Sequence, residues 1–275
     1  MKLRRLLFGL LLSGAIGWLA ERRGSLTRSG AAGAVLTGTS IFGFGGLAWG
    51  LTLIYFFVSS TLLSHFKERE KEAVAADKFS KGARRDIWQA LANAGVAMGA
   101  ALGSGLGRRS PGPASLLAVF VGAMATANAD TWATEVGTLS TEEPRLITTG
   151  QPVAPGTSGG VTLLGTGAAL AGAASVGMVA EALGAARATP LRGRLPEVAL
   201  LSGATGALID SVLGATVQAM YWCPRCQKET ERRVHRCGEA TQPLRGLPWL
   251  ENDAVNFVST AAGGLVALLL ARRGM

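Results

Sequence analysis

Four carboxylates stand inside apolar segments or at their ends: Asp130, Glu135, Asp210 and Asp253. Ionisable side chains at membrane depth are costly, so their presence in several segments indicates a function. Carboxylate oxygens suit Mg²⁺, which binds through one or two carboxylates together with the phosphates of a substrate. The four residues therefore predict a magnesium site. A proton or ion pathway is one alternative, and helix caps or hydrogen bonds between helices are another.

Amide side chains accompany these carboxylates. Gln89 and Asn93 follow Arg85 at intervals of four residues, which puts all three on one face of a helix. Asn128 stands two residues before Asp130. We expect the amides to bind polar groups of a cofactor, and hydrogen bonds between helices are the alternative for each of them.

A run of small residues precedes another apolar segment. It consists of Gly156, Thr157, Ser158, Gly159 and Gly160. Glycines before a helix expose backbone N–H groups, and hydroxyls add donors, so we expect the run to bind phosphate. It lacks the Gly-Lys-Ser/Thr ending of a Walker A motif, and Ser158 could simply cap a helix.

Three basic residues are candidates for neutralising phosphate charge: Lys81, Arg85 and Arg145. Phosphoryl transfer depends on positioning and on electrostatic stabilisation, so we count them as catalytic candidates together with Asp130 and Glu135. For Lys81 and Arg85 the alternative is a solvated basic loop beside a membrane.

The cysteines all lie in one segment, residues 221–252. Cys223 and Cys226 form a CxxC pattern, and His235 and Cys237 form an HxC pattern. Four such ligands could hold structural zinc in a tetrahedron, while a redox pair or ordinary thiols are the alternatives. Three cysteines in one loop do not fit the disulfide framework of a secreted protein.

The elements that must position these residues are apolar segments. Hydrophobic residues make up 48% of the chain and charged residues 16%, and the mean hydropathy is +0.31, which argues against a soluble surface. The 38 glycines suit closely packed membrane helices. Eight segments are near the length that crosses a bilayer: 5–20, 31–46, 47–66, 87–106, 114–130, 159–183, 198–220 and 254–271.

The predicted fold class is all-α, a polytopic membrane bundle of seven or eight helices in a single domain, 1–275. The second and third segments adjoin at Gly43, Gly45 and Gly46, so they form either a tight hairpin or one long helix. The first could be a signal peptide, but the other apolar segments favour a retained helix. With eight spans, Asp210 lies about 15 Å from the end of the seventh.

The net charge of +9 is better explained by basic cytosolic loops than by nucleic acid, which is not an expected partner. The loops 21–30, 67–86, 131–158 and 221–253 share one side and carry 17 of the 27 Lys and Arg residues. We therefore expect this side, with the active site, to face the cytosol. The prediction is a multi-pass protein in contact with the lipid of the cell membrane, with both termini outside.

Several segments resemble one family. They are KGARRDIWQALANAG (81–95), NADTWATEVG (128–137), PRLITTGQPVAPGTSGGVTLLG (144–165), DSVLGATVQA (210–219) and ENDAVNF (251–257). On these residues the chain resembles the domain of unknown function family 92, which includes transmembrane protein 19 and the plant phytyl-phosphate kinase.

The resemblance implies a membrane kinase that converts an isoprenyl monophosphate, such as phytyl or geranylgeranyl phosphate, to its diphosphate. An acidic segment followed by a Gly/Ser-rich one is also similar to CTP-using dolichol and phytol kinases. This similarity implies a nucleoside triphosphate, with CTP favoured, and Mg²⁺. The alternative is a transporter or ion-coupled channel that uses the buried carboxylates, although the sequence has no internal repeat.

Overall fold

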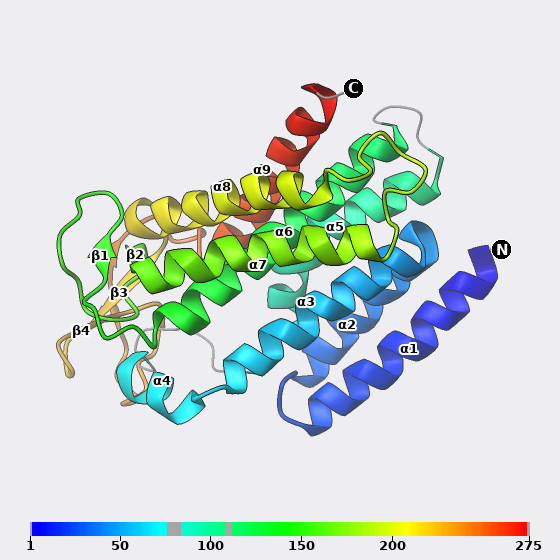
Figure 1. The fold of residues 1–275 in the computed structure, drawn as a ribbon. Coiled ribbons are helices and arrows are strands. Elements are labelled where there is room, and N and C mark those ends of the chain that lie inside the picture. Colours follow the sequence, from blue (N-terminus) through cyan, green and yellow to red (C-terminus); the bar gives the residue numbers. More distant parts are fainter. Residues whose placement is uncertain (1, 76–83, 108–111, 274–275) are drawn as a thin grey trace.

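The protein is a bundle of long helices. The computed structural model describes residues 2–75, 84–107 and 112–273. Within these ranges the helices lie side by side, as Figure 1 shows. They are α1 (Lys2–Arg22), α2 (Arg28–Ser40), α3 (Leu47–His65), α4 (Glu68–Ala75), α5 (Ile87–Gly105), α6 (Pro113–Gly137), α7 (Leu163–Ala182), α8 (Leu195–Thr216) and α9 (Asn252–Arg273).

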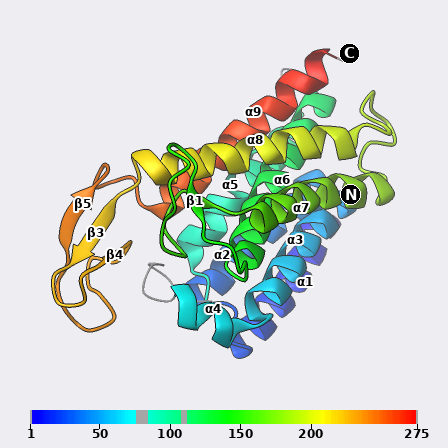
Figure 2. The same cartoon turned by 60° about the vertical axis from the view of Figure 1, so that its left-hand side comes forward.

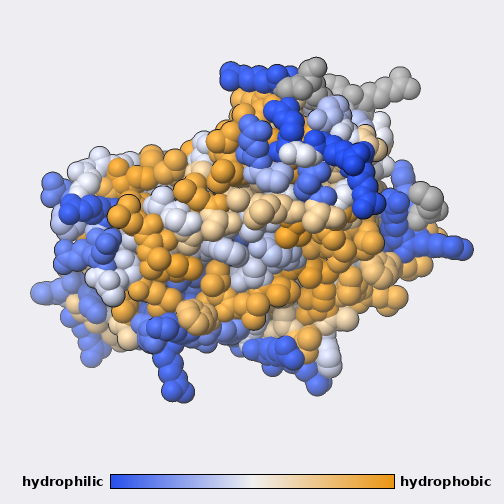
Figure 3. Space-filling view, in the orientation of Figure 1, coloured by the Kyte–Doolittle hydropathy of each residue, from blue (hydrophilic) through white to orange (hydrophobic). Residues whose placement is uncertain are grey.

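Six of these helices are long and apolar enough to cross a membrane: α1, α3, α6, α7, α8 and α9. In Figure 3 apolar side chains cover much of the face between the two ends of the bundle, and hydrophilic side chains gather at the left-hand end. The prediction of a polytopic membrane helix bundle is therefore confirmed. The remaining two predicted spans are helical as well, over α2 and α5.

A glycine separates the second and third predicted spans. The short π-helix η1 (Ile41–Gly45) continues α2, and Gly46 then adopts a φ of 90°. Glycine enters this left-handed region readily because it has no Cβ. The chain reverses there and α3 returns along the bundle (Figure 1), so the two segments are separate helices.

Helix α6 lies at the centre of the bundle. It packs against α5, α7, α8 and α9, and 78% of the residues in its apolar 18-residue stretch are buried. The neighbours approach closely through small residues. A Cβ on Gly263 of α9 would lie 1.9 Å from Thr126 Oγ1 of α6, and one on Gly203 of α8 would lie 2.7 Å from Ala173 Cβ of α7. The packing thus uses the small faces that the glycine content predicts.

Three of the helix boundaries that differ from the predicted segments bear on the site. The fifth segment was predicted to end at Asp130, but α6 continues as far as Gly137. Helix α7 begins at Leu163, where the Thr162 side chain caps it. Helix α8 ends at Thr216, so Asp210 lies about 9 Å from that end rather than about 15 Å.

Two small antiparallel sheets lie in the loops. The first pairs β1 (Arg145–Leu146) with β2 (Gly160–Val161). The second has the order β4-β3-β5, made of β4 (Lys228–Thr230), β3 (Met220–Cys223) and β5 (Gln242–Arg245). Figure 2 shows this second sheet projecting from the same end of the bundle as β1 and α4.

The four predicted cytosolic loops meet at that end. The first loop joins the second through a parallel bridge between Leu26 and Arg85. Residues of the second, third and fourth loops line one cavity there. The structure thus confirms that these loops share a side, while the orientation of that side in the cell stays a prediction.

Candidate functional site

A cavity of about 440 Å³ opens at the end of the bundle where the loops gather. Residues of α3 to α9, of the loop between α6 and α7 and of the segment after β4 line it. Most of the predicted site residues are among them: Arg85, Gln89, Asn93, Asp130, Glu135, Gly156, Thr157, Ser158, Gly159, Gly160 and Asp210. Predicted site residues from four separate parts of the sequence therefore share one cavity.

Two of the predicted carboxylates line the cavity from different helices, Asp130 from α6 and Asp210 from α8. The negative charges of Asp130 and Glu231 both act on the Asp210 carboxylate. Ser259 Oγ of α9 donates a 2.9 Å hydrogen bond to Asp210 Oδ2, which fixes that carboxylate. Asp130, Asp210 and Glu231 thus form an acidic side of the cavity.

Carboxylates outnumber cations in the described lining of the cavity. The carboxylates are Glu68, Asp130, Glu135, Glu142, Asp210 and Glu231, and the cations are Lys71, Arg85, Arg232 and Arg236. Among the described residues no group of these carboxylates has its ligand atoms as close together as the cysteine cluster does. Spaced carboxylates of this kind suit Mg²⁺ that takes its other ligands from a phosphate substrate and water.

Glu135 is held by cations rather than standing alone. Lys71 Nζ of α4 forms an ion pair with its Oε2, and Ser64 Oγ of α3 donates a 2.6 Å hydrogen bond to its Oε1. Arg85 Nη2 lies 3.4 Å from Ser64 Oγ. Burial lowers the pKa of Arg85, and the charge of Glu135 opposes that shift. Glu135 therefore pairs with Lys71 directly and lies close enough to Arg85 for its charge to act on that guanidinium.

The predicted phosphate loop forms another wall. Gly156 and Gly159 have φ values of 76° and 81°, so two left-handed residues curl the chain around Thr157 and Ser158. Ser158 Oγ donates a 2.9 Å hydrogen bond to Gln218 Oε1 beyond the end of α8. The loop leads into α7 through Thr162, whose Oγ1 accepts from Gly165 N at 3.0 Å. The loop is thereby fixed against α8 and beside a helix N-terminus.

Two of the three predicted amide side chains line the cavity, and the third does not. Gln89 Oε1 accepts from Asp86 N in a capping box that begins α5, and Asn93 Nδ2 donates to Gln89 O at 2.9 Å. Both still line the cavity. Asn128 does not line it, since it is fully buried and donates to Gly172 O at 2.8 Å. Asn128 therefore joins α6 to α7.

Three other candidates lie apart from the cavity or from the described chain. Arg145 is exposed and donates to Gly150 O at 2.9 Å within its own loop. Asp253 lines a separate hollow beside Glu251 instead of joining Asp130 and Asp210. Lys81 lies outside the described residues.

The cavity also contains residues that sequence reasoning did not select. Lys71 lies in the charged run 67–72, where it has no feature that separates it from its neighbours. Glu231, Arg232 and Arg236 lie within the predicted cysteine loop. Only their proximity to predicted zinc ligands could have marked them.

An apolar arm extends from the polar part of the cavity between α7 and α8. Ala169 and Leu170 of α7 line it on one side, and Ala204, Ala207 and Leu208 of α8 line it on the other. Leu170 and Leu208 are both exposed side chains. The lining of the cavity is therefore apolar between α7 and α8 and ionic at the end where the loops gather.

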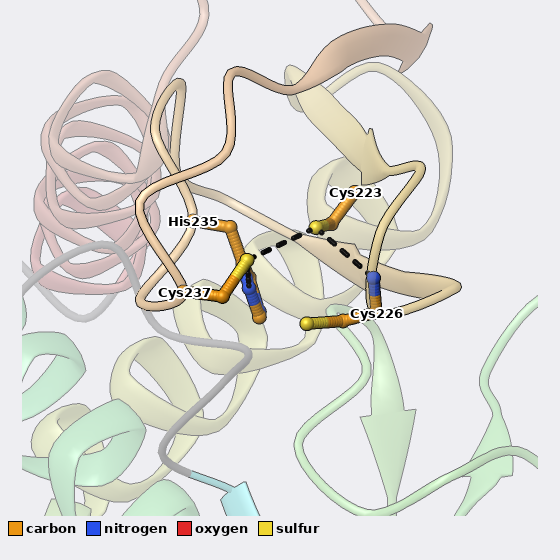
Figure 4. Close-up of side chains that lie close together, drawn as sticks. All are labelled: Cys223, Cys226, His235 and Cys237. Carbon is orange, nitrogen blue, oxygen red and sulfur yellow. Dashed lines mark hydrogen bonds between the residues drawn. The ribbon is translucent and has the colours of Figure 1, made fainter.

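The predicted zinc ligands form a cluster at the end of β3 and in the loops beside it (Figure 4). The ligand atoms of Cys223, Cys226, His235 and Cys237 all lie within 4.8 Å of one another, and none of the cysteines forms a disulfide. Contact with His235 lowers the pKa of Cys237 to about 6, while contact with Cys237 raises the pKa of Cys226 to about 11. The thiolate form is thus favoured at Cys237 over Cys226.

Comparison with known proteins identifies the family. The model of the integral membrane protein family DUF92 matches residues 11–264. The chain belongs to this family. The predicted resemblance is thereby confirmed.

Relatives of this DUF92 member align along most of its length. Protein PGR of Arabidopsis thaliana is 35% identical over 271 residues, which cover 93% of this chain and 92% of that protein. The uncharacterized membrane protein MJ0933 of Methanocaldococcus jannaschii is 25% identical, with 97% and 94% covered. Protein VTE6, chloroplastic, of Arabidopsis thaliana is 29% identical, with 89% and 65% covered. No solved structure matches.

Proposed function

We propose that this DUF92 protein is a membrane phosphotransferase that converts an isoprenyl monophosphate to its diphosphate with a nucleoside triphosphate. One observation carries the proposal, namely a single cavity that combines carboxylates, cations and a Gly/Ser/Thr loop with an apolar arm between α7 and α8. An isoprenyl phosphate has a matching ionic part and apolar part, since it carries an anionic phosphate at one end of a long apolar chain. The family resemblance in the sequence supports the same class of substrate.

The apolar arm would take the isoprenyl chain. Leu170 and Leu208 line the cavity and are both exposed, and a lipid-soluble substrate would enter between α7 and α8 without crossing water. Its phosphate would then lie at the polar end of the arm. Phytyl and geranylgeranyl phosphates are the substrates of choice for testing this class.

The reaction needs little covalent participation by the protein. A phosphate oxygen of the isoprenyl monophosphate forms a bond with the γ-phosphorus of the nucleotide, and the bond between that phosphorus and the β–γ bridging oxygen breaks. The products are the isoprenyl diphosphate and the nucleoside diphosphate. The attacking phosphate is already ionised near neutral pH, so positioning and charge neutralisation supply the catalysis.

The two sides of the cavity would divide this work. Lys71, paired with Glu135, and Arg85 would neutralise phosphate oxygens, and the loop 156–160 would bind phosphate through N–H and hydroxyl groups. Asp130 and Asp210 would hold Mg²⁺, with Glu231 nearby. Bound Mg²⁺ would supply charge stabilisation at the transferred phosphoryl group.

The experiment is a turnover assay on the full chain purified in detergent. Phytyl and geranylgeranyl phosphates are each offered with Mg²⁺ and, in turn, with CTP, ATP, GTP and UTP. The proposal predicts isoprenyl diphosphate and nucleoside diphosphate in equal amounts from at least one pair, with CTP as the expected donor. EDTA should stop the reaction. Folded protein that yields no diphosphate from any pair would argue against a kinase.

A further inference from the structure

The cysteine cluster has the dimensions of a tetrahedral metal site. Cys223 Sγ and Cys237 Sγ lie 3.7 Å apart. Two sulfurs bound to one tetrahedral zinc at about 2.3 Å would be separated by about 3.8 Å. His235 Nδ1 lies 3.2 Å from Cys237 Sγ, so a nitrogen ligand completes the set on the same side. Three thiols and one imidazole are a common set of structural zinc ligands.

The backbone holds the two ligand pairs on matching tight turns. In the first pair Cys226 N donates to Cys223 Sγ at 3.4 Å, and the following residue, Gln227, has a φ of 51°. In the second pair Gly238 follows Cys237 with a φ of 83°. A non-glycine residue in the left-handed region is uncommon. The strained turn at Gln227 is therefore consistent with a chain shaped around a bound ion.

The cluster is partly shielded from solvent. Cys223 is fully buried and His235 is 4% exposed, while Cys226 and Cys237 are half-buried. Cys223 ends β3, and the other three ligands lie in loops beside a sheet of three short strands. Small units that cannot bury enough apolar surface are commonly held together by metals or disulfides. The cysteines here are free, which leaves a metal as the crosslink.

We propose that Cys223, Cys226, His235 and Cys237 bind one structural Zn²⁺, and that this zinc holds Glu231, Arg232 and Arg236 at the rim of the cavity. All three rim residues lie within six positions of a ligand in the sequence, on the segment that joins β4 to Cys237. The zinc site itself does not depend on the proposed kinase activity. Its influence on substrate binding does rest on that function.

Hydrogen bonds connect the zinc-bearing segment to the phosphate loop. Gln218 Nε2 donates to Glu231 Oε1 at 2.9 Å, while its Oε1 accepts from Ser158 Oγ. On the other side of the sheet Arg245 forms an ion pair with Glu229 and donates to Gly214 O at the end of α8. The zinc would therefore order a segment that contacts both the loop and α8.

Metal content tests the site directly. Full-length protein, purified in detergent under reducing conditions and washed with a weak chelator, should contain one zinc per chain. Replacing that zinc with Co²⁺ should produce thiolate charge-transfer absorption and the visible bands of a tetrahedral ion. Cys223→Ser and His235→Asn should lose the metal. His65→Asn is the matched control, because His65 is the other histidine of the chain and should leave one zinc in place.

Limited trypsin digestion of the wild type tests the ordering role without any variant. Removal of zinc should accelerate cleavage after Arg232 and Arg236 by about tenfold or more, because local opening exposes those bonds. Cleavage after Lys67 and Arg69 is the internal control and should not change. This comparison stands even if a ligand variant fails to fold.

Each result has a defined meaning. Reduced wild-type protein without stoichiometric zinc, or with iron in its place, would overturn the zinc assignment. Zinc retained by both ligand variants would overturn the choice of ligands. Zinc that can be removed without faster cleavage after Arg232 and Arg236 would overturn the ordering role. A protein that binds zinc as described but makes no diphosphate would contradict only the proposed kinase.

Discussion

At the scale of single residues, the cavity depends on how buried charges are paired. The Lys71 side chain is 10% exposed and that of Glu135 is 22% exposed, so their ion pair is largely removed from water. Lys71 Nζ also donates to Leu63 O and Ser64 O. Such a group stabilises the fold and at the same time presents positive charge to the cavity.

Lys71→Met should destabilise the protein more than Lys67→Met. Loss of Lys71 leaves Glu135 partly buried without its main counter-ion, which costs up to about 3 kcal/mol in unfolding free energy. Lys67 forms an exposed pair with Glu70, and its loss should cost less than about 1 kcal/mol. Thermal unfolding of both variants in detergent measures the difference. Equal melting temperatures would contradict the importance of the buried pair.

Site residues could be predicted from the sequence where a polar residue interrupts an apolar run. Asp130 and Asp210 stand out because each is an ionisable residue within an apolar run, and both line the cavity. Lys71 and Glu231 lie among other charged residues, so only tertiary structure distinguishes them. Asn128 has the same local signal as Asp130, but it points at the carbonyl of Gly172, and sequence spacing does not reveal that direction.

At the scale of elements, the position of the phosphate loop depends on a glycine that touches α8. Gly159 has a φ of 81°, and a Cβ there would lie 2.5 Å from Ala215 Cβ and 2.6 Å from Ala215 N. No flexible side chain lies between them, so the loop or the helix would have to move. The sequence predicted the loop from its composition but could not predict which glycine contacts α8.

Gly159→Ala should displace the loop and raise the KM for both phosphate substrates by about tenfold. Gly150→Ala is the matched control. It has a similar φ of 70° and would carry the same backbone strain, but nothing lies within 4 Å of its Cβ. Its KM should stay within about twofold of the wild type. Steady-state kinetics compare the two variants, and equal KM values would argue that contact with α8 does not position the loop.

The element boundaries show where sequence reasoning stops. Apolar runs near the length that crosses a bilayer predicted eight segments, and the structure has a helix over each of them. Their ends depended on local bonds, such as the cap by Thr162, and on strand pairing of Tyr221 with Thr230. Small sheets of this kind form from polar segments without a strong alternating pattern, so the sequence did not predict them.

At the scale of the whole molecule, polar loops gather at one end of the bundle and the chain termini lie away from them (Figure 1). The positive-inside bias predicts that the loop-bearing end faces the cytosol, because it carries most of the Lys and Arg residues. The nucleotide would then reach the cavity from the cytosol and the isoprenyl chain from the membrane.

Reporter fusions test this orientation. A reporter placed after Met275 should report a position outside the cytosol, and one placed after Gly150 should report the cytosol. Alkaline phosphatase and green fluorescent protein fusions give opposite signals at each position and so check one another. A cytosolic reporter after Met275 would reverse the predicted orientation, and the cavity would then face away from the cytosol.

The most direct test of the account measures transfer of a γ-labelled nucleotide phosphate to the isoprenyl monophosphate by matched variants. Wild type should place the label in the isoprenyl diphosphate, and Asp130→Asn and Asp210→Asn should each reduce the rate by about 10²-fold or more at equal amounts of folded protein. Glu197→Gln, an exposed carboxylate in the first turn of α8, should match the wild type. Label transfer at the wild-type rate by both aspartate variants would contradict the claim that this cavity carries the reaction.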